Sequence, residues 1–444
     1  MPRLLLLISL LFAVSGCGGC SSDVSDVEEI SADGKTMDPV APPEFAAAAD
    51  WPWWRGPTRD GKAGGDHSYP TEWSETKNVV WKADVPGRGS GSPIVVGNRV
   101  FLLTADASRQ VQSVLCYDRT TGKRIWRKDV HQGKLGKVGH SHSTYASSTA
   151  ACDGKRVFAL FRNDGRIVMT ALNLRGEQRW QRPIERHTSD HGFGTSPVIY
   201  KELVIVVADS AKYGFIAGLH RKTGEVWWKK RRPAYDSYSS PVIANVGGKD
   251  QLLISGGKQV ISYDPMTGRQ NWAVDACAET TCGTMVWEGD MVFASGGYSK
   301  RETAGIRVDG NSATVVWRND LKAYVPSLLV HEGRVYGNDF SGASPTSVLH
   351  CLDAKTGKRT WRVRISRGCY GSPVLAGGYL YLPERNGKVT ILKPGPRRAE
   401  KVAVNALGDA MDATPTAAAG RLFLRVAHGS GRNRRETLYC IGNK

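Results

Sequence analysis

The chain has 444 residues, a net charge of +18 and 50 glycines. Its length alone would suit two or three domains, and the glycines fit a fold with many tight turns. No stretch after residue 14 is long and apolar enough to span a bilayer.

The first sixteen residues have the pattern of an export signal. Arg3 supplies a positive start, and Leu4 to Val14 form an apolar core too short to cross a membrane. The sequence Val14-Ser-Gly-Cys17 resembles a bacterial lipobox, which predicts cleavage before Cys17 and lipidation of its thiol. The alternative is that Cys17-Gly-Gly-Cys20 is a metal or redox motif. Gly18 after the cysteine favours anchoring in the outer membrane, facing the periplasm, or otherwise at the cell envelope.

Two segments separate this anchor from the main body of the chain. Residues 17–50 are acidic, small and rich in Pro and Ala, so we expect a disordered tether. Residues 51–77 begin Trp51-Pro-Trp-Trp54 and are too apolar for a free linker. We expect a strap packed on the lower surface of the following domain; an aromatic ligand-binding patch is the alternative.

Residues 78–444 contain a repeat. Its fullest copy is Asp118-Arg-Thr-Thr-Gly122-Lys-Arg-Ile-Trp126, and copies with Thr-Gly recur before Trp228, Trp272 and Trp361. The Asp accepts backbone N–H groups in a turn, the Gly supplies positive φ, and the Trp can pack on the neighbouring unit. Tryptophans recur every 44 to 54 residues, a period typical of blade-type repeats.

Eight small-residue elements, most with the pattern Ser/Thr-Pro, precede apolar strands and mark eight units of four strands each. The predicted fold is therefore all-β, an eight-bladed β-propeller of four-stranded antiparallel blades with tryptophan-docking repeats. The last unit ends at residues 438–441 without a fourth strand. We expect residues 78–85 to complete it and close the ring.

This repeat resembles that of quinoprotein-type propellers, a group that holds pyrroloquinoline quinone (PQQ) dehydrogenases and the non-enzymatic BamB-like lipoproteins of outer-membrane assembly. The dehydrogenases often carry adjacent cysteines over the cofactor, and no Cys-Cys pair occurs here. Their Glu, Asn and Asp calcium ligands cannot be matched residue by residue. We therefore expect a non-enzymatic binding or scaffold lipoprotein without a cofactor; the alternative is a PQQ- and Ca²⁺-dependent alcohol or sugar dehydrogenase.

The expected binding surface is the mouth of the ring, where the connections between blades meet. The residues that we assign to this face are His140, His142, Tyr145, Asp190, His191, Asp236, Tyr238, Tyr370 and Asp412. His140, His142, His187 and His191 could converge on zinc or copper, or form a hydrogen-bonding polar rim. The expected partner is an envelope protein, a peptide or a polysaccharide, bound by a monomeric propeller; nucleic acid is not expected for an exported protein.

The basic surface and the cysteines have simple interpretations. A Lys or Arg follows five of the repeat tryptophans on the predicted outermost strands, where a charged side chain keeps the exposed strand edge from pairing with another chain. The alternative is that these charges attract anionic polymers.

Cys116, Cys351 and Cys440 share one repeat position and should be inert buried thiols. Cys277 and Cys282 flank a loop, and we predict a disulfide between them in an oxidising compartment.

Overall fold

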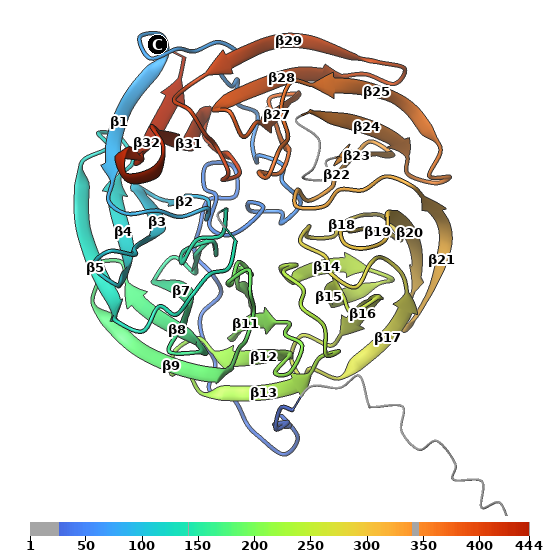
Figure 1. The fold of residues 1–444 in the computed structure, drawn as a ribbon. Helices are drawn as coiled ribbons and strands as arrows, with labels where there is room; N and C mark the ends of the chain where they lie inside the picture. The colour runs from blue at the N-terminus through green and yellow to red at the C-terminus, as the bar shows by residue number, and fades with distance from the viewer. Residues whose placement is uncertain (1–25, 141, 340–345, 444) are drawn as a thin grey trace, which may run out of the picture.

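The structure is a computed structural model that describes residues 26–140, 142–339 and 346–443, and Cys17 and the signal segment lie outside these ranges. It is a ring of eight four-stranded antiparallel sheets, the predicted eight-bladed propeller (Figure 1). The one helical segment described is the 3₁₀ turn η1 (Gly431–Asn433). No helix in these ranges has the length and apolar character needed to cross a membrane.

Blades 1 to 4 are built from consecutive strands, ordered from the centre outward. Blade 1 comprises β2 (Ile94–Val96), β3 (Arg99–Asp106), β4 (Val111–Asp118) and β5 (Arg124–Gln132). Blade 2 comprises β6 (Ala151–Cys152), β7 (Arg156–Asn163), β8 (Arg166–Asn173) and β9 (Gln178–Arg186). Blade 3 comprises β10 (Val198–Tyr200), β11 (Leu203–Ala208), β12 (Phe215–His220) and β13 (Val226–Arg231). Blade 4 comprises β14 (Val242–Val246), β15 (Lys249–Gly256), β16 (Gln259–Tyr263) and β17 (Gln270–Asp275).

Blades 5 to 7 repeat the plan, and blade 8 joins the two ends of the ring. Blade 5 comprises β18 (Val286–Glu288), β19 (Met291–Gly296), β20 (Glu302–Asp309) and β21 (Ser312–Asn319). Blade 6 comprises β22 (Leu329–His331), β23 (Arg334–Asp339), β24 (Ser347–Asp353) and β25 (Arg359–Ile365). Blade 7 comprises β26 (Val374–Ala376), β27 (Tyr379–Pro383), β28 (Lys388–Pro394) and β29 (Ala399–Ala406). Blade 8 comprises β30 (Thr416–Ala418), β31 (Arg421–His428), β32 (Arg435–Gly442) and β1 (Val79–Val85).

Ring closure follows the prediction. Strand β1 is the outermost strand of blade 8 and pairs antiparallel with β32, from Val79 opposite Ile441 to Val85 opposite Glu436. The two ends of the propeller are therefore held by a ladder of backbone hydrogen bonds with one irregularity between Val79 and Trp81.

The blades dock through the repeat tryptophan of one blade and the turn glycine of the next. A Cβ added at Gly122 of blade 1 would lie 2.5 Å from the ring of Trp81 of blade 8, so only glycine lets the ring pack there. The Trp81 indole N–H also donates to the Arg119 carbonyl in the same turn (2.9 Å). Asp118 holds this turn by accepting the backbone N–H of Thr121 (2.8 Å). The repeat motif therefore builds a turn and its docking surface together.

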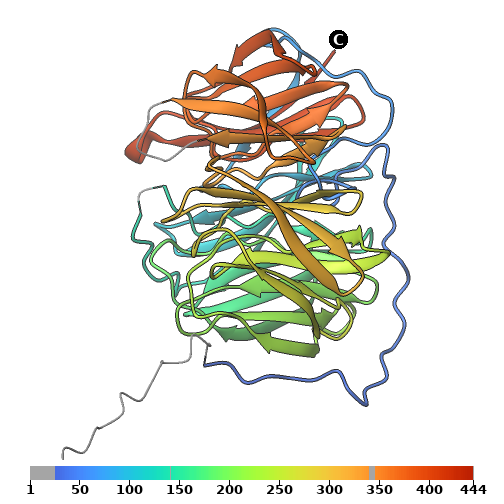
Figure 2. The same ribbon diagram turned by 90° about the vertical axis from the view of Figure 1, so that its right-hand side faces the viewer.

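Residues 51–62 lie across the centre of the ring on one face and contact the innermost strands (Figure 1). Trp51 pairs with Val95 on the innermost strand of blade 1. The buried Arg55 donates to the carbonyls of Leu328 (2.6 Å) and Pro373 (2.9 Å), which precede the innermost strands of blades 6 and 7. Burial lowers the pKa of Arg55 to about 10. Figure 2 shows the N-terminal chain (blue) along one face of the ring and the longer connections on the opposite face.

The expectation of a disordered tether is wrong for residues 26–50, which lie against the propeller. Val27 is buried, and Ile30 pairs antiparallel with Lys229 on the outer edge of blade 3 through two 2.9 Å hydrogen bonds. Val27 and Phe45 pack against the core of blades 2 and 3, so the order of the segment comes from its contacts with the ring.

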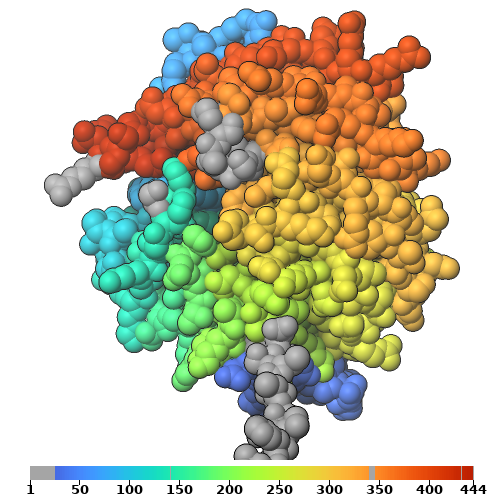
Figure 3. All heavy atoms as spheres, turned by 45° about the vertical axis from the view of Figure 1, so that its right-hand side comes forward, coloured from blue at the N-terminus to red at the C-terminus, as the bar shows by residue number. Residues whose placement is uncertain are grey.

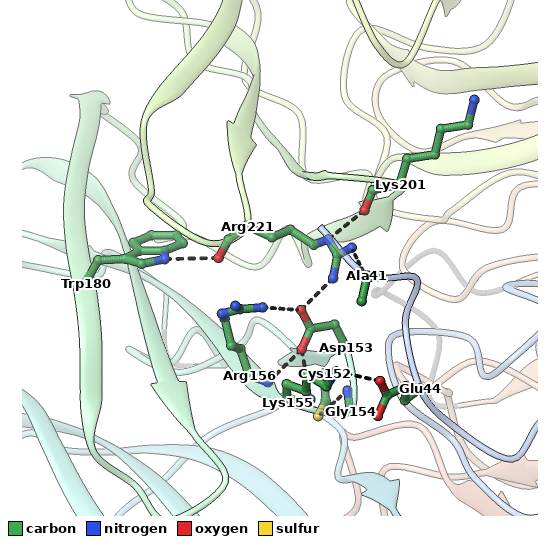
Figure 4. Close-up of polar contacts among 10 residues, drawn as sticks. All are labelled: Ala41, Glu44, Cys152, Asp153, Gly154, Lys155, Arg156, Trp180, Lys201 and Arg221. Atoms are coloured by element: carbon green, nitrogen blue, oxygen red, sulfur yellow. Dashed lines mark hydrogen bonds and ion pairs between the residues drawn. The ribbon is translucent and has the colours of Figure 1, made fainter. Parts of the chain in front are cut away.

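Arg221 fixes the middle of this segment (Figure 4). Its guanidinium donates to the Ala41 carbonyl (2.9 Å), the Lys201 carbonyl (2.6 Å) and the Asp153 carboxylate (2.5 Å). Arg221 and Asp153 are both buried, so this pair joins blade 2, blade 3 and the N-terminal segment.

Candidate functional site

The face opposite the N-terminal chain carries an imidazole and tyrosine cluster built from several blades. His140 and His142 lie on the β5–β6 connection, with ring centroids 5.3 Å apart. His191, on the β9–β10 connection, lies 5.6 Å from His140 and 6.1 Å from Tyr238. Tyr370, before β26, lies 5.8 Å from His142. We call this face the mouth face and these five residues the mouth cluster.

Arg385 completes the cluster and was not predicted from the sequence. It lies on the β27–β28 connection, and its guanidinium stacks 4.1 Å above the Tyr370 ring. Its Nη2 donates to the His142 ring (2.8 Å), and its Nε lies 3.8 Å from the Asp412 carboxylate. No motif marks Arg385, because its contacts come from blades distant in the chain.

Burial and charge set the protonation of this cluster. Partial burial lowers the pKa of His142, and the neighbouring Arg385 lowers it further. A neutral imidazole can accept the Arg385 hydrogen bond, which an imidazolium cannot. Burial raises the pKa of Tyr370 and that of Tyr238, so both are neutral phenols that can donate or accept. The mouth cluster is therefore polar, and Arg385 beside it carries a positive charge.

Three residues assigned to this face do not join the cluster. The Tyr145 hydroxyl donates to the Gly136 carbonyl within its own connection. The exposed Asp190 contributes its backbone carbonyl, which accepts the Gly139 N–H (2.6 Å). Asp236 accepts the Ala211 N–H, and burial raises the pKa of its carboxyl.

His187 lies apart from the other histidines. It is buried beside Phe193 and faces the Asp209 carbonyl. Across residues 26–140, 142–339 and 346–443, no group of three or more His, Cys, Asp or Glu side chains is arranged to hold a metal ion.

The predicted disulfide is absent, because Cys277 and Cys282 are free thiols. Cys277 is packed in the apolar core between blades 4 and 5, where its N–H donates to Glu302. Cys282 lies near Tyr238 and Tyr324 of the mouth instead. The two side chains thus belong to different environments. Cys116, Cys351 and Cys440 are buried as expected, and burial raises the pKa of each thiol.

A cleft of about 1090 Å³ opens on the mouth face between blades 8 and 1. His142 is one of its lining residues, and the connection from β31 to β32 contributes Gly429, Ser430 and Gly431. Figure 3 shows a recess between the red chain of blade 8 and the teal β5–β6 connection. No sequence motif marked this cleft, because it forms where the two ends of the ring meet.

These features define the class of protein: an eight-bladed, tryptophan-docked propeller that is filled by its own chain at one face and presents a polar mouth at the other. A family model described as outer membrane protein assembly factor BamB matches residues 71–211, 186–343 and 306–398. The match covers well over half of the chain, which therefore belongs to the BamB family.

A curated relative and two solved structures are also similar to this chain. The outer membrane protein assembly factor BamB of Burkholderia pseudomallei (strain K96243) is 25% identical over 341 residues, 73% of this chain and 80% of that protein. The crystal structure of BamB from Moraxella catarrhalis has a TM-score of 0.59 at 17% identity and covers 81% of this chain and 96% of its own. Quinohemoprotein alcohol dehydrogenase from Comamonas testosteroni has a TM-score of 0.65 at 14% identity, covering 90% and 82%. At these identities the two solved structures show the fold alone.

The mouth residues do not fit the calcium ion that accompanies PQQ in the quinoprotein resemblance. A calcium ion takes six to eight oxygen ligands. Here Asp412 faces Arg385, Asp236 accepts a backbone N–H, and the cationic Arg385 lies over Tyr370. This donor set repels a cation instead of coordinating one.

Proposed function

We propose that this protein is a non-enzymatic, membrane-anchored scaffold of the cell envelope that takes part in outer-membrane protein assembly. Lipidated Cys17 holds it in the outer membrane, facing the periplasm, and the monomeric propeller binds an envelope protein through its mouth face. The family match over residues 71–398 carries the proposal, and the polar mouth supports it, because a broad surface of imidazoles, phenols and one guanidinium suits a protein partner.

Affinity capture from detergent-solubilised membranes tests the binding role. The protein should retain an envelope protein of outer-membrane assembly, and replacement of His140, His142 and His191 together by Ala should weaken this capture. Capture that is unchanged in the triple variant would move the binding surface elsewhere, first to the segment at Trp51–Trp54.

The alternative activity has its own test. Purified protein mixed with PQQ and Ca²⁺ should neither bind the quinone saturably nor reduce a dye with an alcohol or sugar. Saturable binding with Ca²⁺-dependent dye reduction would replace the scaffold proposal with a PQQ-dependent dehydrogenase.

The anchor is tested by Cys17→Ser. Because the thiol accepts the lipid, this variant should incorporate no labelled fatty acid and should leave the membrane fraction. Cys20→Ser, which leaves the lipobox intact, is the control and should stay lipidated. A Cys17→Ser protein that still incorporates label would contradict the anchor.

A further inference from the structure

The N-terminal segment first contacts the ring at the outer edge of blade 3. The Asp26 N–H donates to the carbonyl of Lys212 (2.7 Å), which lies in the β11–β12 connection. The equivalent connection of blade 7, β27–β28, carries Arg385 of the mouth, so the β11–β12 connection also lies on the mouth face. Figure 2 shows the chain (blue) passing round the edge of the ring to the opposite face. Asp26 therefore lies where the mouth face meets the outer edge of blade 3.

Several contacts next to this point hold the chain in place. Val27 is buried and packs in the core of blades 2 and 3, and its carbonyl accepts a hydrogen bond from the Arg231 side chain. Glu29 accepts the backbone N–H of Arg231 (3.1 Å) and pairs with Lys230 (3.1 Å). Because burial, an ion pair and hydrogen bonds all act here, the chain joins the ring at a defined place.

The proposed lipid anchor is close to this place in the sequence. Cys17 precedes Asp26 by nine residues, which span at most about 30 Å even when fully extended. A compact domain of this length is on the order of 50 Å across. The outer edge of blade 7 lies opposite blade 3 in the ring (Figure 1). Blade 7 therefore cannot face the bilayer that holds the lipid, because Asp26 would then lie farther from the bilayer than the chain can reach.

The docking of residues 26–50 is what restricts the orientation of the propeller. A free tether over all of residues 17–50 could span roughly 110 Å, and every surface of the ring could then face the membrane. Because residues 26–50 lie against the ring, only the short stretch that precedes Asp26 is left to connect the ring to the anchor.

The same part of the mouth face carries residue types that suit a membrane surface. Lys212 lies over the Tyr213 ring (5.4 Å from its centroid), and in the connections next to it Lys258 lies over the Tyr235 ring (5.2 Å). Tyrosine places an apolar ring and a polar hydroxyl at the level of the headgroups, and the ammonium group of lysine can reach the phosphates. We call these four residues, together with Asp26, the blade 3 rim.

Net charge does not select this surface. Lys258 pairs with Glu279 (3.0 Å), and Lys230 pairs with Glu29 (3.1 Å), so both signs are present. The exposed Asp26 adds a further carboxylate. The restriction therefore comes from the length of chain between the ring and the anchor, and it applies to a neutral bilayer as well as to an anionic one.

We propose that the blade 3 rim faces the phospholipid surface that holds lipidated Cys17, and that the short connection to the anchor keeps it there. The proposal rests on the proposed function, because it needs the anchor at Cys17. His191 and Tyr238 lie on the connections at the two sides of blade 3, so this part of the mouth cluster is on the membrane side of the ring. A partner that binds there is held next to the membrane surface.

Energy transfer from the protein to a labelled lipid measures this orientation. A fluorescent amino acid replaces Lys212 on the blade 3 rim or, as the matched control, Lys401 on the outer strand β29 of blade 7; both lysines are exposed. The full-length lipidated protein is placed in phosphatidylcholine vesicles that contain a lipid with an acceptor on its headgroup. Transfer should be higher from position 212 than from position 401. Equal transfer from the two positions would overturn the proposal.

A longer connection to the anchor tests the cause of the orientation. A Gly-Ser insertion of about 24 residues directly before Asp26 leaves the docked segment unchanged and raises the reach to roughly 110 Å. The difference between positions 212 and 401 should then largely disappear. The same Gly-Ser sequence added after Lys444 is the control and should leave the difference unchanged. A difference that persists after the insertion before Asp26 would overturn the role of the short connection.

Incorporation of labelled fatty acid by the same preparations separates this proposal from the proposed function. Lipidated protein with equal transfer from both positions overturns the orientation alone, and the scaffold proposal stands. Protein that incorporates no fatty acid overturns the anchor at Cys17 and the orientation with it. A difference that appears with anionic vesicles but not with phosphatidylcholine would also overturn the proposal, because charge would then set the orientation.

Discussion

At the residue scale, one contact explains why the repeat has its spacing. The tryptophan of most outer strands packs against the turn of the next blade, so the motif recurs at the blade spacing; the outer strand β29 of blade 7 carries no tryptophan. Gly176, Gly224 and Gly357 contact Trp126, Trp180 and Trp317 as Gly122 contacts Trp81. Blade 5 lacks the Thr-Gly turn, and Gly310 there has open space around it.

Gly122→Ala should therefore destabilise the ring. Its φ of +73° is unfavourable for alanine, and the added Cβ collides with Trp81. We expect a loss of about 2–4 kcal/mol in the free energy of unfolding, from backbone strain of ~1 kcal/mol and overpacking of ~1–3 kcal/mol. Gly310 has a φ of +55° and open space around it, so Gly310→Ala should lose only the ~1 kcal/mol that comes from backbone strain. Equal losses in urea titrations of the two variants would contradict the docking account.

Buried histidines make stability depend on pH. Burial lowers the pKa of His187 and that of His131 to about 4, against 6.5 in the unfolded chain. Between pH 6.5 and 4 the unfolded chain binds protons that the folded protein does not, so stability falls as pH falls, by up to ~1.4 kcal/mol per pH unit for each site. His187→Gln should remove one site's share of this slope. Urea titrations at pH 7, 6 and 5 measure it, and an unchanged slope in the variant would refute the assignment.

At the element scale, the outer and inner strands were predictable and the N-terminal segment was not. Strand β1 could be assigned to blade 8 because the last unit lacks a fourth strand. Residues 26–50 have the composition of a tether, and their order depends on distant groups such as Arg221 and Asp153. The composition of a segment therefore cannot predict order that depends on contacts with residues elsewhere in the chain.

Arg221→Ala should release this segment. The change removes the hydrogen bond to Ala41 and leaves the buried Asp153 with Arg156 as its one remaining ion-pair partner among the described residues. Because Arg156 still compensates the Asp153 carboxylate, the loss of stability should be smaller than the roughly 3–5 kcal/mol that breaking an isolated buried pair costs. Limited proteolysis should cut residues 32–45 much faster than in the native protein. Lys201→Ala, which keeps the carbonyl that Arg221 uses, should not change the rate. Protection that persists in Arg221→Ala would show that other contacts hold the segment.

At the scale of the whole molecule, the sequence repeats predicted the fold, but they predicted only part of the candidate site. The blade number, ring closure and the mouth histidines follow from periodicity, since periodicity places equivalent loops on one face. Arg385 and the cleft between blades 8 and 1 do not, because both arise where non-repeated residues from separate blades meet. The prediction of a disulfide was wrong for a related reason. The spacing of Cys277 and Cys282 in the sequence does not show that Cys277 packs in the core and that Cys282 lies near the mouth.

The central claim is that the protein works by binding an envelope protein at its mouth face. Site-specific photo-crosslinking in cells tests it most directly, with the crosslinker at His142 in the mouth and at Arg397 in the β28–β29 turn as the control. We predict an adduct with a protein of outer-membrane assembly from position 142 and none from position 397. An adduct from position 397 with none from position 142 would contradict the account.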